Sequence, residues 1–336
     1  MKILVTGGAG FIGSHTTVAL ITAGHEAVIV DNFSNSYPWI VDRIKEITGT
    51  IPPLYKGDCT NGQFIANVCE KEPDIDGVIH FAAYKAVGES IEKPISYYRN
   101  NLSSLLTLLE KMQEYDIKNI VFSSSATVYG EPDTNPLTEN SPRKDATCPY
   151  GTTKLIAEDV LRDVVKSGAY ISAVPLRYFN PIGAHDSHRI GELPQDVPNN
   201  LVPYITQTAA GMREKLTIFG DDYDTKDGTC IRDFIHIMDL ADAHVKTLEY
   251  LTEQNAPFFD VFNVGTGKGT SIKELIDTFE EVNDIKLPYE IGPRRDGDIS
   301  ACWADTAKIH DIIGWQSHKT IADAMYDAWQ WQKTLQ

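Results

Sequence analysis

Two side chains four residues apart, Tyr150 and Lys154, are well placed in this 336-residue chain to move a proton. Residues at this spacing share one face of a helix. A tyrosine hydroxyl is a poor base because its unperturbed pKa is near ~10, but a nearby ammonium favours the phenolate and lowers that pKa. Ser125, which ends a run of three serines, offers a hydroxyl that can bridge the phenol and a substrate. The pattern predicts acid–base chemistry, although such a pair alone is more often a chance feature of a helix surface.

A glycine-rich loop near the start of the chain strengthens that interpretation. Gly7, Gly10 and Gly13 follow a short apolar run and open a helical stretch, as a turn beneath a dinucleotide pyrophosphate requires. Asp31 follows the second apolar run, where a carboxylate accepts both ribose hydroxyls of NAD and repels the 2′-phosphate of NADP. We therefore predict NAD as the cofactor. The alternative is a tight strand–helix turn, with Asp31 at a solvated strand end.

Alternating apolar runs and helical windows predict a doubly wound parallel sheet that positions these residues. We expect strands at 2–6, 26–30, 53–56, 77–80, 119–123 and 171–175, and helices at 11–23, 64–71, 95–115 and 150–167. After Asn180 the chain becomes rich in prolines and loops. The sequence thus predicts an α/β protein with a Rossmann-type NAD-binding domain over residues 1–179. A smaller C-terminal α/β substrate lobe follows over 180–336, with an interleaved boundary.

The helical window around residues 102–112 is apolar on more than one face, so it must be buried on several sides. One explanation is contact with the sheet and with neighbouring helices. The other is a dimer interface that this helix builds together with the helix at 150–167. The sequence leaves both explanations open.

Bulk composition excludes several classes of partner. A formal net charge of −17 argues against binding to nucleic acid or to an anionic membrane, and no apolar stretch is long enough to span a bilayer. An anionic substrate stays possible, because a few arginines can form a positive pocket. The cysteines form no Cys-x-x-Cys pair and are odd in number, so we expect neither a metal site nor a disulfide framework, and a cytoplasmic location. They are Cys59, Cys69, Cys148, Cys230 and Cys302.

The glycine loop, Asp31, the serine run and the Tyr150/Lys154 pair resemble those of the extended short-chain dehydrogenase/reductase family. Over essentially its full length the chain looks like the UDP-hexose 4-epimerases of that family. This closer resemblance rests on blocks in the expected order at residues 81–90, 123–130, 176–181, 198–201, 227–233 and 294–298. It implies a homodimer that binds NAD tightly and acts on a UDP-sugar.

The resemblance also implies a role for individual residues. Tyr150 resembles the catalytic base, Lys154 the residue that lowers its pKa and holds the nicotinamide ribose, and Ser125 the bridging hydroxyl. Besides these three, the residues that resemble cofactor contacts are Gly7, Gly10, Phe11, Ile12, Gly13, Asp31, Asn32, Asp58, Cys59, Phe81, Ala82, Lys85, Asn100 and Phe179. Besides Ser125 and Tyr150, those that resemble sugar-nucleotide contacts are Lys85, Asn180, Asn200, Leu201, Thr217, Phe219, Arg232, Arg295, Asp298 and Cys302.

Arg232 and Arg295 are the candidates to clamp the diphosphate, because guanidinium groups match phosphate oxygens. The alternative is an ordinary surface ion pair with a neighbouring acid: Asp233, Asp296 or Asp298.

The reaction that the resemblance implies has no net redox change. Tyr150 removes the proton of the sugar 4-hydroxyl while NAD takes the hydride, and the transient 4-keto sugar turns over before reduction on its other face. A 4,6-dehydratase would need an acid beside Ser125, where this chain has Ala126 and Thr127. A plain reductase would more usually prefer NADP, against which Asp31 argues. A non-catalytic NAD-sensing protein could dispense with Tyr150 and Lys154.

Cys302 matches a position at which epimerases restricted to small hexoses resemble each other in having a tyrosine. A cysteine leaves more room beside carbon 2 of the sugar. We therefore expect turnover of UDP-N-acetylglucosamine and UDP-N-acetylgalactosamine as well. The alternative is a small packing residue whose neighbours close the gap.

Overall fold

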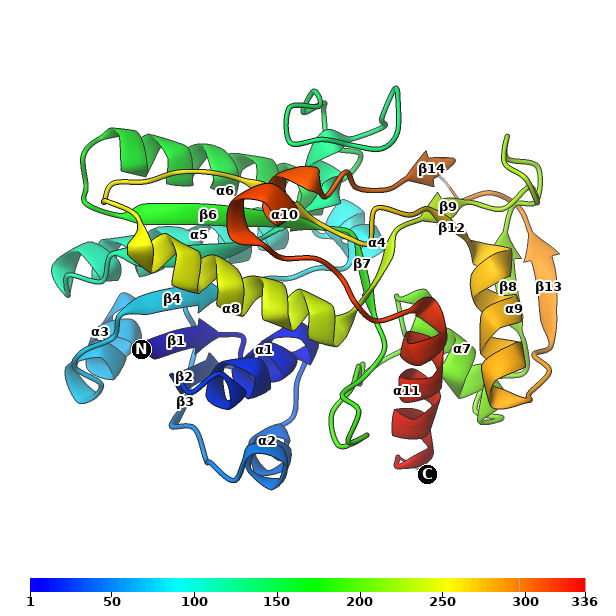
Figure 1. Cartoon of the computed structure of the whole chain (residues 1–336), viewed down its shortest axis with the longest axis horizontal. Coiled ribbons are helices and arrows are strands. Elements are labelled where there is room, and N and C mark those ends of the chain that lie inside the picture. Colours follow the sequence, from blue (N-terminus) through cyan, green and yellow to red (C-terminus); the bar gives the residue numbers. More distant parts are fainter. Residues whose placement is uncertain (296, 336) are drawn as a thin grey trace.

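Seven parallel strands form the central sheet of the protein, whose computed structural model describes residues 1–295 and 297–335 (Figure 1). The strand order is β11-β6-β5-β4-β1-β2-β3, with every neighbouring pair parallel. The Rossmann-type fold that the sequence predicts is confirmed. The strands are β1 (Lys2–Thr6), β2 (Glu26–Asp31), β3 (Leu54–Lys56), β4 (Gly77–His80), β5 (Asn119–Ser125), β6 (Ser172–Tyr178) and β11 (Phe262–Val264).

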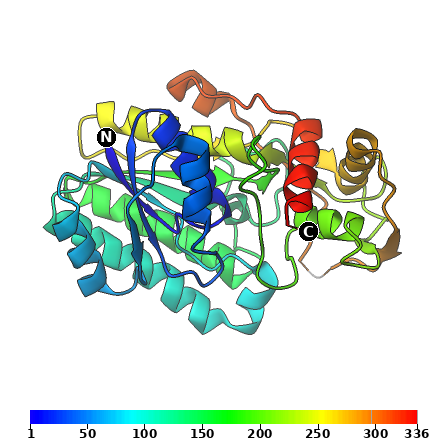
Figure 2. The same ribbon diagram turned by 90° about the horizontal axis from the view of Figure 1, so that it is seen from below.

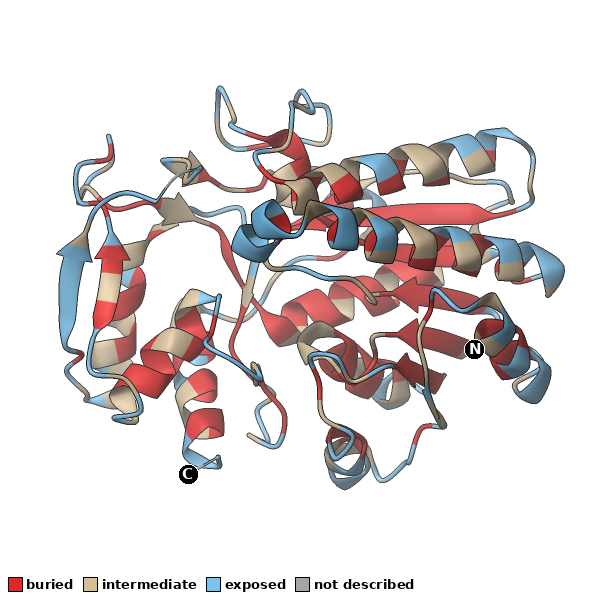
Figure 3. Ribbon diagram, turned by 180° about the vertical axis from the view of Figure 1, so that it is seen from behind, coloured by how far each residue is buried: buried red, intermediate tan, exposed pale blue. Residues whose placement is uncertain are grey.

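Helices cover both faces of this sheet (Figure 2). Helices α3 (Gly62–Lys71), α5 (Pro94–Glu114) and α6 (Pro149–Lys166) pack on one face, and α1 (Phe11–Thr22) and α8 (Ile237–Glu253) on the other. Successive strand residues alternate between the two cores: Leu4 joins the first, while Ile3 and Val5 join the second. Burial on both faces, visible in Figure 3, explains why the strands appear in the sequence as continuous apolar runs.

The structure extends the last two predicted strands and thereby corrects the place of the serine run. Strand β5 continues to Ser125, because Ser124 and Ser125 still pair with Arg177 and Tyr178 of β6. Polar residues at the end of an apolar run look like a loop in the sequence. Here they stay within the sheet, since their backbone is paired and their side chains are buried.

The second lobe lies beyond the carboxyl end of the sheet (Figure 1). Its core gathers apolar side chains of α7 (Leu201–Ala209), β8 (Leu216–Phe219), β10 (Phe234–His236), α9 (Ile272–Asn283) and α11 (Ile321–Lys333). After β10 the chain leaves this lobe and returns through α8 and β11 to the central sheet, so the two halves are interleaved in sequence. The remaining elements are α2 (Ile40–Thr48), α4 (Val87–Glu92), η1 (Ala126–Tyr129), β7 (Asn180–Ile182), β9 (Ile231–Arg232), β12 (Thr270–Ser271), β13 (Tyr289–Gly292), β14 (Ala301–Cys302) and α10 (Ala307–Ile313).

Helix α5 (Pro94–Glu114) owes most of its apolar surface to contact with the sheet and its neighbouring helices. Leu105, Leu108 and Met112 are buried in the core shared with the sheet, α3 and α6. Leu106 faces away from that core and is 47% exposed. Contact with the sheet therefore explains most of the apolar surface of this helix, and a remainder stays uncovered in the single chain. Within the described ranges, no helix combines the length and apolarity that crossing a membrane requires.

Candidate active site

The carboxyl end of β5 and the first turns of α6 bring Ser125, Tyr150 and Lys154 together. Ser125 ends β5 and is the N-cap of η1, accepting a hydrogen bond from the Thr127 amide at 3.2 Å. The Lys154 Nζ lies 5.7 Å from the centroid of the Tyr150 ring and donates to the Ser123 carbonyl oxygen at 2.5 Å. A phenol, a hydroxyl and an amine thus converge at the sheet edge where doubly wound folds bind their ligands.

The electrostatics of this trio differ from the sequence-based expectation. Burial raises the pKa of Tyr150 to about 12, and the hydrogen bond with Ser125 only partly opposes that rise. Burial also lowers the pKa of Lys154 to about 7, against the attraction of Glu158. The expected lowering of the tyrosine pKa relied on the ammonium together with a positive nicotinamide ring; in the chain by itself the ammonium points to a carbonyl and desolvation dominates. A further positive charge, such as oxidised nicotinamide brings, favours the phenolate.

A buried network behind the trio was missed by sequence reasoning. Glu158 accepts from Arg177 Nε at 2.8 Å and from its Nη2 at 2.6 Å, and also from the Ser124 hydroxyl at 2.6 Å. These bonds tie α6, β5 and β6 together at the point where each contributes to the site. Glu158 lies four residues after Lys154, so helical spacing was the one signal that could have pointed to it.

The β1–α1 turn fits a dinucleotide. Gly7 has φ +69°, and a Cβ added there would lie 2.9 Å from the Ala82 amide nitrogen. A Cβ on Gly13 would overlap the Gly7 carbonyl oxygen, whereas Gly10 meets only that oxygen at 3.3 Å. Helix α1 begins at Phe11 with no side chain capping it, so the amides of its first turn, Ile12 included, are available to an anion. The lack of side chains leaves room for a pyrophosphate.

Asp31 ends β2 beside this turn. Its carboxylate accepts from the Ala9 amide at 3.0 Å, and from the Phe33 amide and Ser36 hydroxyl, each at 2.8 Å. These bonds fix the carboxylate next to the glycine loop, rather than at a solvated strand end. The residues present therefore fit a dinucleotide with free ribose hydroxyls.

Other predicted cofactor contacts line the neighbouring strand ends. Asn32 donates to Asp58 at 3.2 Å, and the buried Cys59 thiol has its pKa raised to about 12 by burial. Phe81 follows β4 and its ring lies 4.8 Å from that of His244. Asn100 donates to Asn101 at 3.0 Å.

Asn101 is a second residue that sequence reasoning missed. Its side chain pairs with both backbone groups of Tyr84, at 2.8 and 3.0 Å, and donates to Thr153 of α6 at 3.1 Å. It therefore joins the loop after β4, which includes Ala82 and Lys85, to the helix of Tyr150. Nothing in its local sequence distinguishes it from an ordinary helical asparagine.

The second lobe places Arg232 and Arg295 on one carboxylate. Arg295 Nε donates to Asp298 at 2.9 Å, and Arg232 Nη2 lies 3.6 Å from the same side chain. Asp233 is turned the other way, accepting from backbone amides of Thr266 at 2.8 Å and Ala304 at 3.1 Å. Both arginines therefore pair with Asp298, as the surface ion-pair alternative allows, and among the described residues neither pairs with Asp233. Asp296 lies outside the described residues.

The remaining predicted contacts flank these arginines or the Rossmann edge. The Phe219 ring lies 4.8 Å from the Arg295 guanidinium, and Thr217 lies two residues before it on β8. Cys302 of β14 is in register with Arg232 of β9 and is buried in one cluster with Phe179. Asn180 begins β7, Leu201 begins α7, and Asn200 is the N-cap residue of α7.

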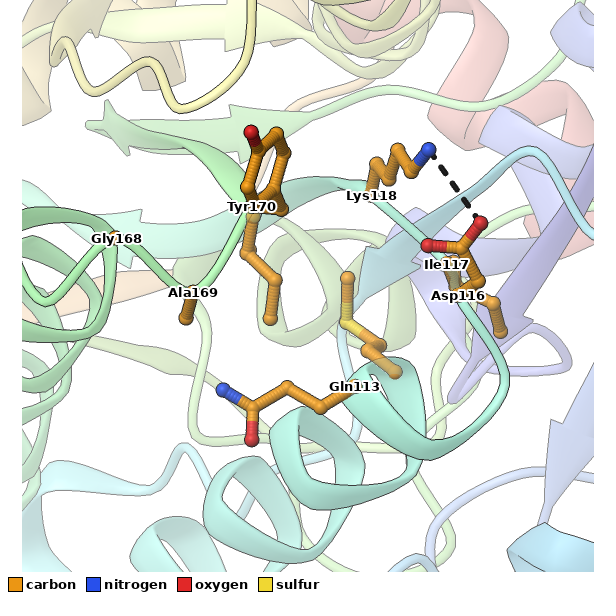
Figure 4. Close-up of a pocket in the computed structure, with 9 residues that line it drawn as sticks. Gln113, Asp116, Ile117, Lys118, Gly168, Ala169 and Tyr170 are labelled. Carbon is orange, nitrogen blue, oxygen red and sulfur yellow. Dashed lines mark ion pairs between the residues drawn. The ribbon is translucent and has the colours of Figure 1, made fainter.

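The hollow drawn in Figure 4 lies elsewhere, at the amino ends of β5 and β6. It is lined by Met112, Lys118 and Tyr170 among others, and Lys118 pairs with Asp116 at 3.4 Å. None of the predicted site residues lines it. Over the part of the chain that the structure describes, no three histidine, cysteine or acidic side chains gather as a metal site would require.

Known proteins of similar sequence and fold identify the family of this chain. The model of the NAD dependent epimerase/dehydratase family matches residues 3–265. A UDP-glucose 4-epimerase of Bacillus subtilis is 49% identical over 334 residues, which cover 99% of this chain and 97% of that protein.

Two solved structures are similar over nearly the whole chain. The UDP-glucose 4-epimerase of Bifidobacterium longum, in complex with NAD+ and UDP, has a TM-score of 0.95 at 46% identity and covers 99% of this chain and 98% of its own. That of Stenotrophomonas maltophila, with bound NAD and formylated UDP-arabinopyranose, has a TM-score of 0.97 at 45% identity, covering 100% and 98%. The chain therefore belongs to the NAD dependent epimerase/dehydratase family, among its UDP-glucose 4-epimerases.

Proposed function

We propose that this chain interconverts UDP-glucose and UDP-galactose by inverting carbon 4 of the sugar, with NAD as a tightly held cofactor. The observation that supports this most is the convergence of Ser125, Tyr150 and Lys154 beside a glycine loop that has room for a pyrophosphate. Ala126 and Thr127, which follow Ser125, offer no carboxyl group for dehydration. The Tyr150/Lys154 pair argues against a purely NAD-sensing protein.

The protein's own groups would divide the work as follows. NAD, when bound, supplies a reversible hydride acceptor beside the sugar. Tyr150 as the phenolate would take the proton of the sugar 4-hydroxyl and would return it from its own hydroxyl, while Ser125, which hydrogen-bonds to the phenol, would bridge to the sugar. Lys154 would hold the ribose next to the nicotinamide. Arg232 and Arg295 would anchor the diphosphate, so that the hexose can turn over while the nucleotide stays fixed.

The direct test uses purified protein and UDP-galactose. We expect NAD to co-purify with the chain, and UDP-glucose to form without added reductant or oxidant. A chain that retains NAD but forms no UDP-glucose would favour the NAD-sensing alternative.

The substrate range should include the N-acetylated pair. Cys302 is a small side chain beside Arg232, and a tyrosine there would fill space within the proposed sugar-nucleotide site. We expect UDP-N-acetylglucosamine and UDP-N-acetylgalactosamine to be interconverted by the native chain, and Cys302→Tyr to lose this activity while keeping that on UDP-galactose. No turnover of the acetylated pair by the native chain would reject the proposal.

The chain should act as a homodimer. Three apolar side chains of the paired helices α5 and α6 face solvent in the single chain: Ile95, Leu106 and Ile156, exposed by 71, 47 and 36%. A second copy could cover them with the same surface. Light scattering should give twice the chain mass, and Leu106→Glu should lower the measured mass toward that of a single chain.

The location that we propose is the cytoplasm. The five free thiols are all buried, which fits a reducing compartment.

A further inference from the structure

Residues 188–195, here called the crossing segment, link the second lobe to the NAD-binding half. The segment lies between β7 and α7, yet Ile190 is fully buried in a core that otherwise belongs to the first half, with Val18, Ile29 and Ile40. Arg189 pairs with Glu46 of α2. The segment is thus fixed on the β2–α2 side of the sheet.

A second contact joins the crossing segment to the loop around Asp31. Gln195 Nε2 donates to the Ser36 carbonyl oxygen at 2.9 Å. The Ser36 hydroxyl in turn donates to the Asp31 carboxylate at 2.8 Å, as does the Phe33 amide. Gln195 therefore holds the loop that orients the carboxylate proposed to bind the adenosine ribose.

A third contact reaches the loop after β4. The Glu192 carboxylate accepts from Lys85 at 3.0 Å and from Asn200 at 2.6 Å. Its carbonyl oxygen accepts from the Trp331 indole of α11 at 3.2 Å, and Gly191 leaves no room for a side chain against that ring. The segment is thereby held between α11 and two loops that flank the proposed cofactor site.

We propose that the crossing segment slows the release of NAD, with Gln195 as a positioning residue that acts through the loop at residues 33–36. This inference rests on the proposed function, which requires a cofactor that stays bound through each turnover. Departure of NAD past Asp31 requires that loop to move, and the loop cannot move freely while Gln195 holds Ser36 and Ile190 anchors the segment. The device restrains the cofactor without touching the reacting atoms.

The test measures release of radiolabelled NAD from loaded protein after addition of excess unlabelled NAD. Gln195→Ala should speed release roughly fivefold, the effect of losing about one neutral hydrogen bond. Gln195→Glu should speed it at least as much, because a carboxylate facing the Ser36 carbonyl repels it. The matched control is Val197→Ala, which truncates another exposed side chain two residues along and should release NAD at the native rate.

Two further readouts separate this proposal from a general loss of stability and from the proposed function. The midpoint of thermal unfolding should fall by no more than about 2 °C in both Gln195 variants, and turnover of UDP-galactose with saturating NAD should match the native chain. Release rates that do not differ between Gln195→Ala and Val197→Ala would overturn the role of the crossing segment even in an active epimerase. Faster release from Gln195→Ala in a chain without epimerase activity would overturn the proposed function instead.

Discussion

The two ends of the proposed site are built in opposite ways. Around Tyr150, the supporting side chains are buried: Lys154, Glu158 and Arg177 are exposed by 3, 1 and 4%. Around the nucleotide anchor, the side chain of Arg295 is 56% exposed and shares Asp298 with Arg232. The first end has its geometry fixed before any ligand binds, whereas the second holds its arginines on a carboxylate that phosphate oxygens can replace.

This difference matches the demands of the reaction. Proton transfer requires the phenol, the serine and the amine at fixed positions, and buried hydrogen bonds in a medium of low dielectric constant provide them. Anchoring a nucleotide requires only that opposite charges lie close together, and two arginines that share one carboxylate can reorganise as the ligand arrives. Substitutions around Tyr150 should therefore change the rate of the chemical step or the stability of the fold. Substitutions at the arginines should change the apparent affinity for the nucleotide.

The largest effect should come from Tyr150→Phe, which removes the proposed proton acceptor and little else. We expect turnover of UDP-galactose to fall by about 10³-fold or more, within the range of general acid–base catalysis combined with loss of the substrate hydrogen bond. The variant should still co-purify with NAD. Turnover within tenfold of the native chain would exclude the tyrosine as the base.

The next effect is on stability, at the buried end. Glu158→Gln leaves the Arg177 guanidinium buried without its charged partner, and we expect a loss of about 3–5 kcal/mol in the free energy of unfolding. Denaturation by urea measures it.

Asp277→Asn is the matched control, because it makes the same change in an exposed pair with Lys273. It should shift the free energy of unfolding by less than about 0.5 kcal/mol. Equal losses in the two variants would mean that burial adds nothing to the cost of breaking the pair between Glu158 and Arg177.

The parts of this arrangement that the sequence could predict are those encoded within a few residues. The turn at Gly7 and Gly13 and the spacing of Tyr150 and Lys154 are local, and the structure has both. The bond between Gln195 and Ser36 spans 159 residues, so no local pattern announces it. The return of β11 to the central sheet also depends on long-range pairing.

Charge was harder to predict than position. Sequence spacing correctly predicted an ammonium near a phenol. It could not predict the direction in which Lys154 points or how strongly burial desolvates Tyr150. Likewise, three acids lay near the two arginines in sequence, and only the fold showed that Asp233 turns toward Thr266. Which side chains meet the ligands stays a prediction, and substitutions at the exposed end test it.

At the nucleotide end, Arg232→Ala should act on apparent affinity. Loss of a charged hydrogen bond to a diphosphate costs about 1.5–3 kcal/mol, so we expect KM for UDP-galactose to rise roughly 10–100-fold while kcat changes little. Arg294→Ala is the control, since Arg294 pairs with Asp222 at 2.6 Å and has no proposed ligand role. A fall in kcat as large as the rise in KM would show that Arg232 contributes to the chemical step and would blur the division between the two ends.

The smallest effect concerns the charge on Lys154 in the NAD-free chain. Its pKa is lowered by burial to about 7, so between about pH 7 and about pH 10 the unfolded chain binds a proton that the folded chain does not. Stability should therefore rise with pH at the lower end of this window, by about 1 kcal/mol between about pH 7 and 8. At higher pH the raised pKa values of the Cys59, Cys69 and Cys302 thiols act in the opposite direction, because the unfolded thiols ionise near ~8.5 while the folded ones keep their protons.

Urea unfolding of the NAD-free chain at the two pH values measures this change. Lys154→Met should abolish the rise, whereas Lys273→Met, a change in an exposed lysine, should keep it. A flat profile in the native chain would mean that Lys154 stays an ammonium in its buried position, held there by Glu158. The buried end would then have its charge as well as its geometry set before the cofactor binds.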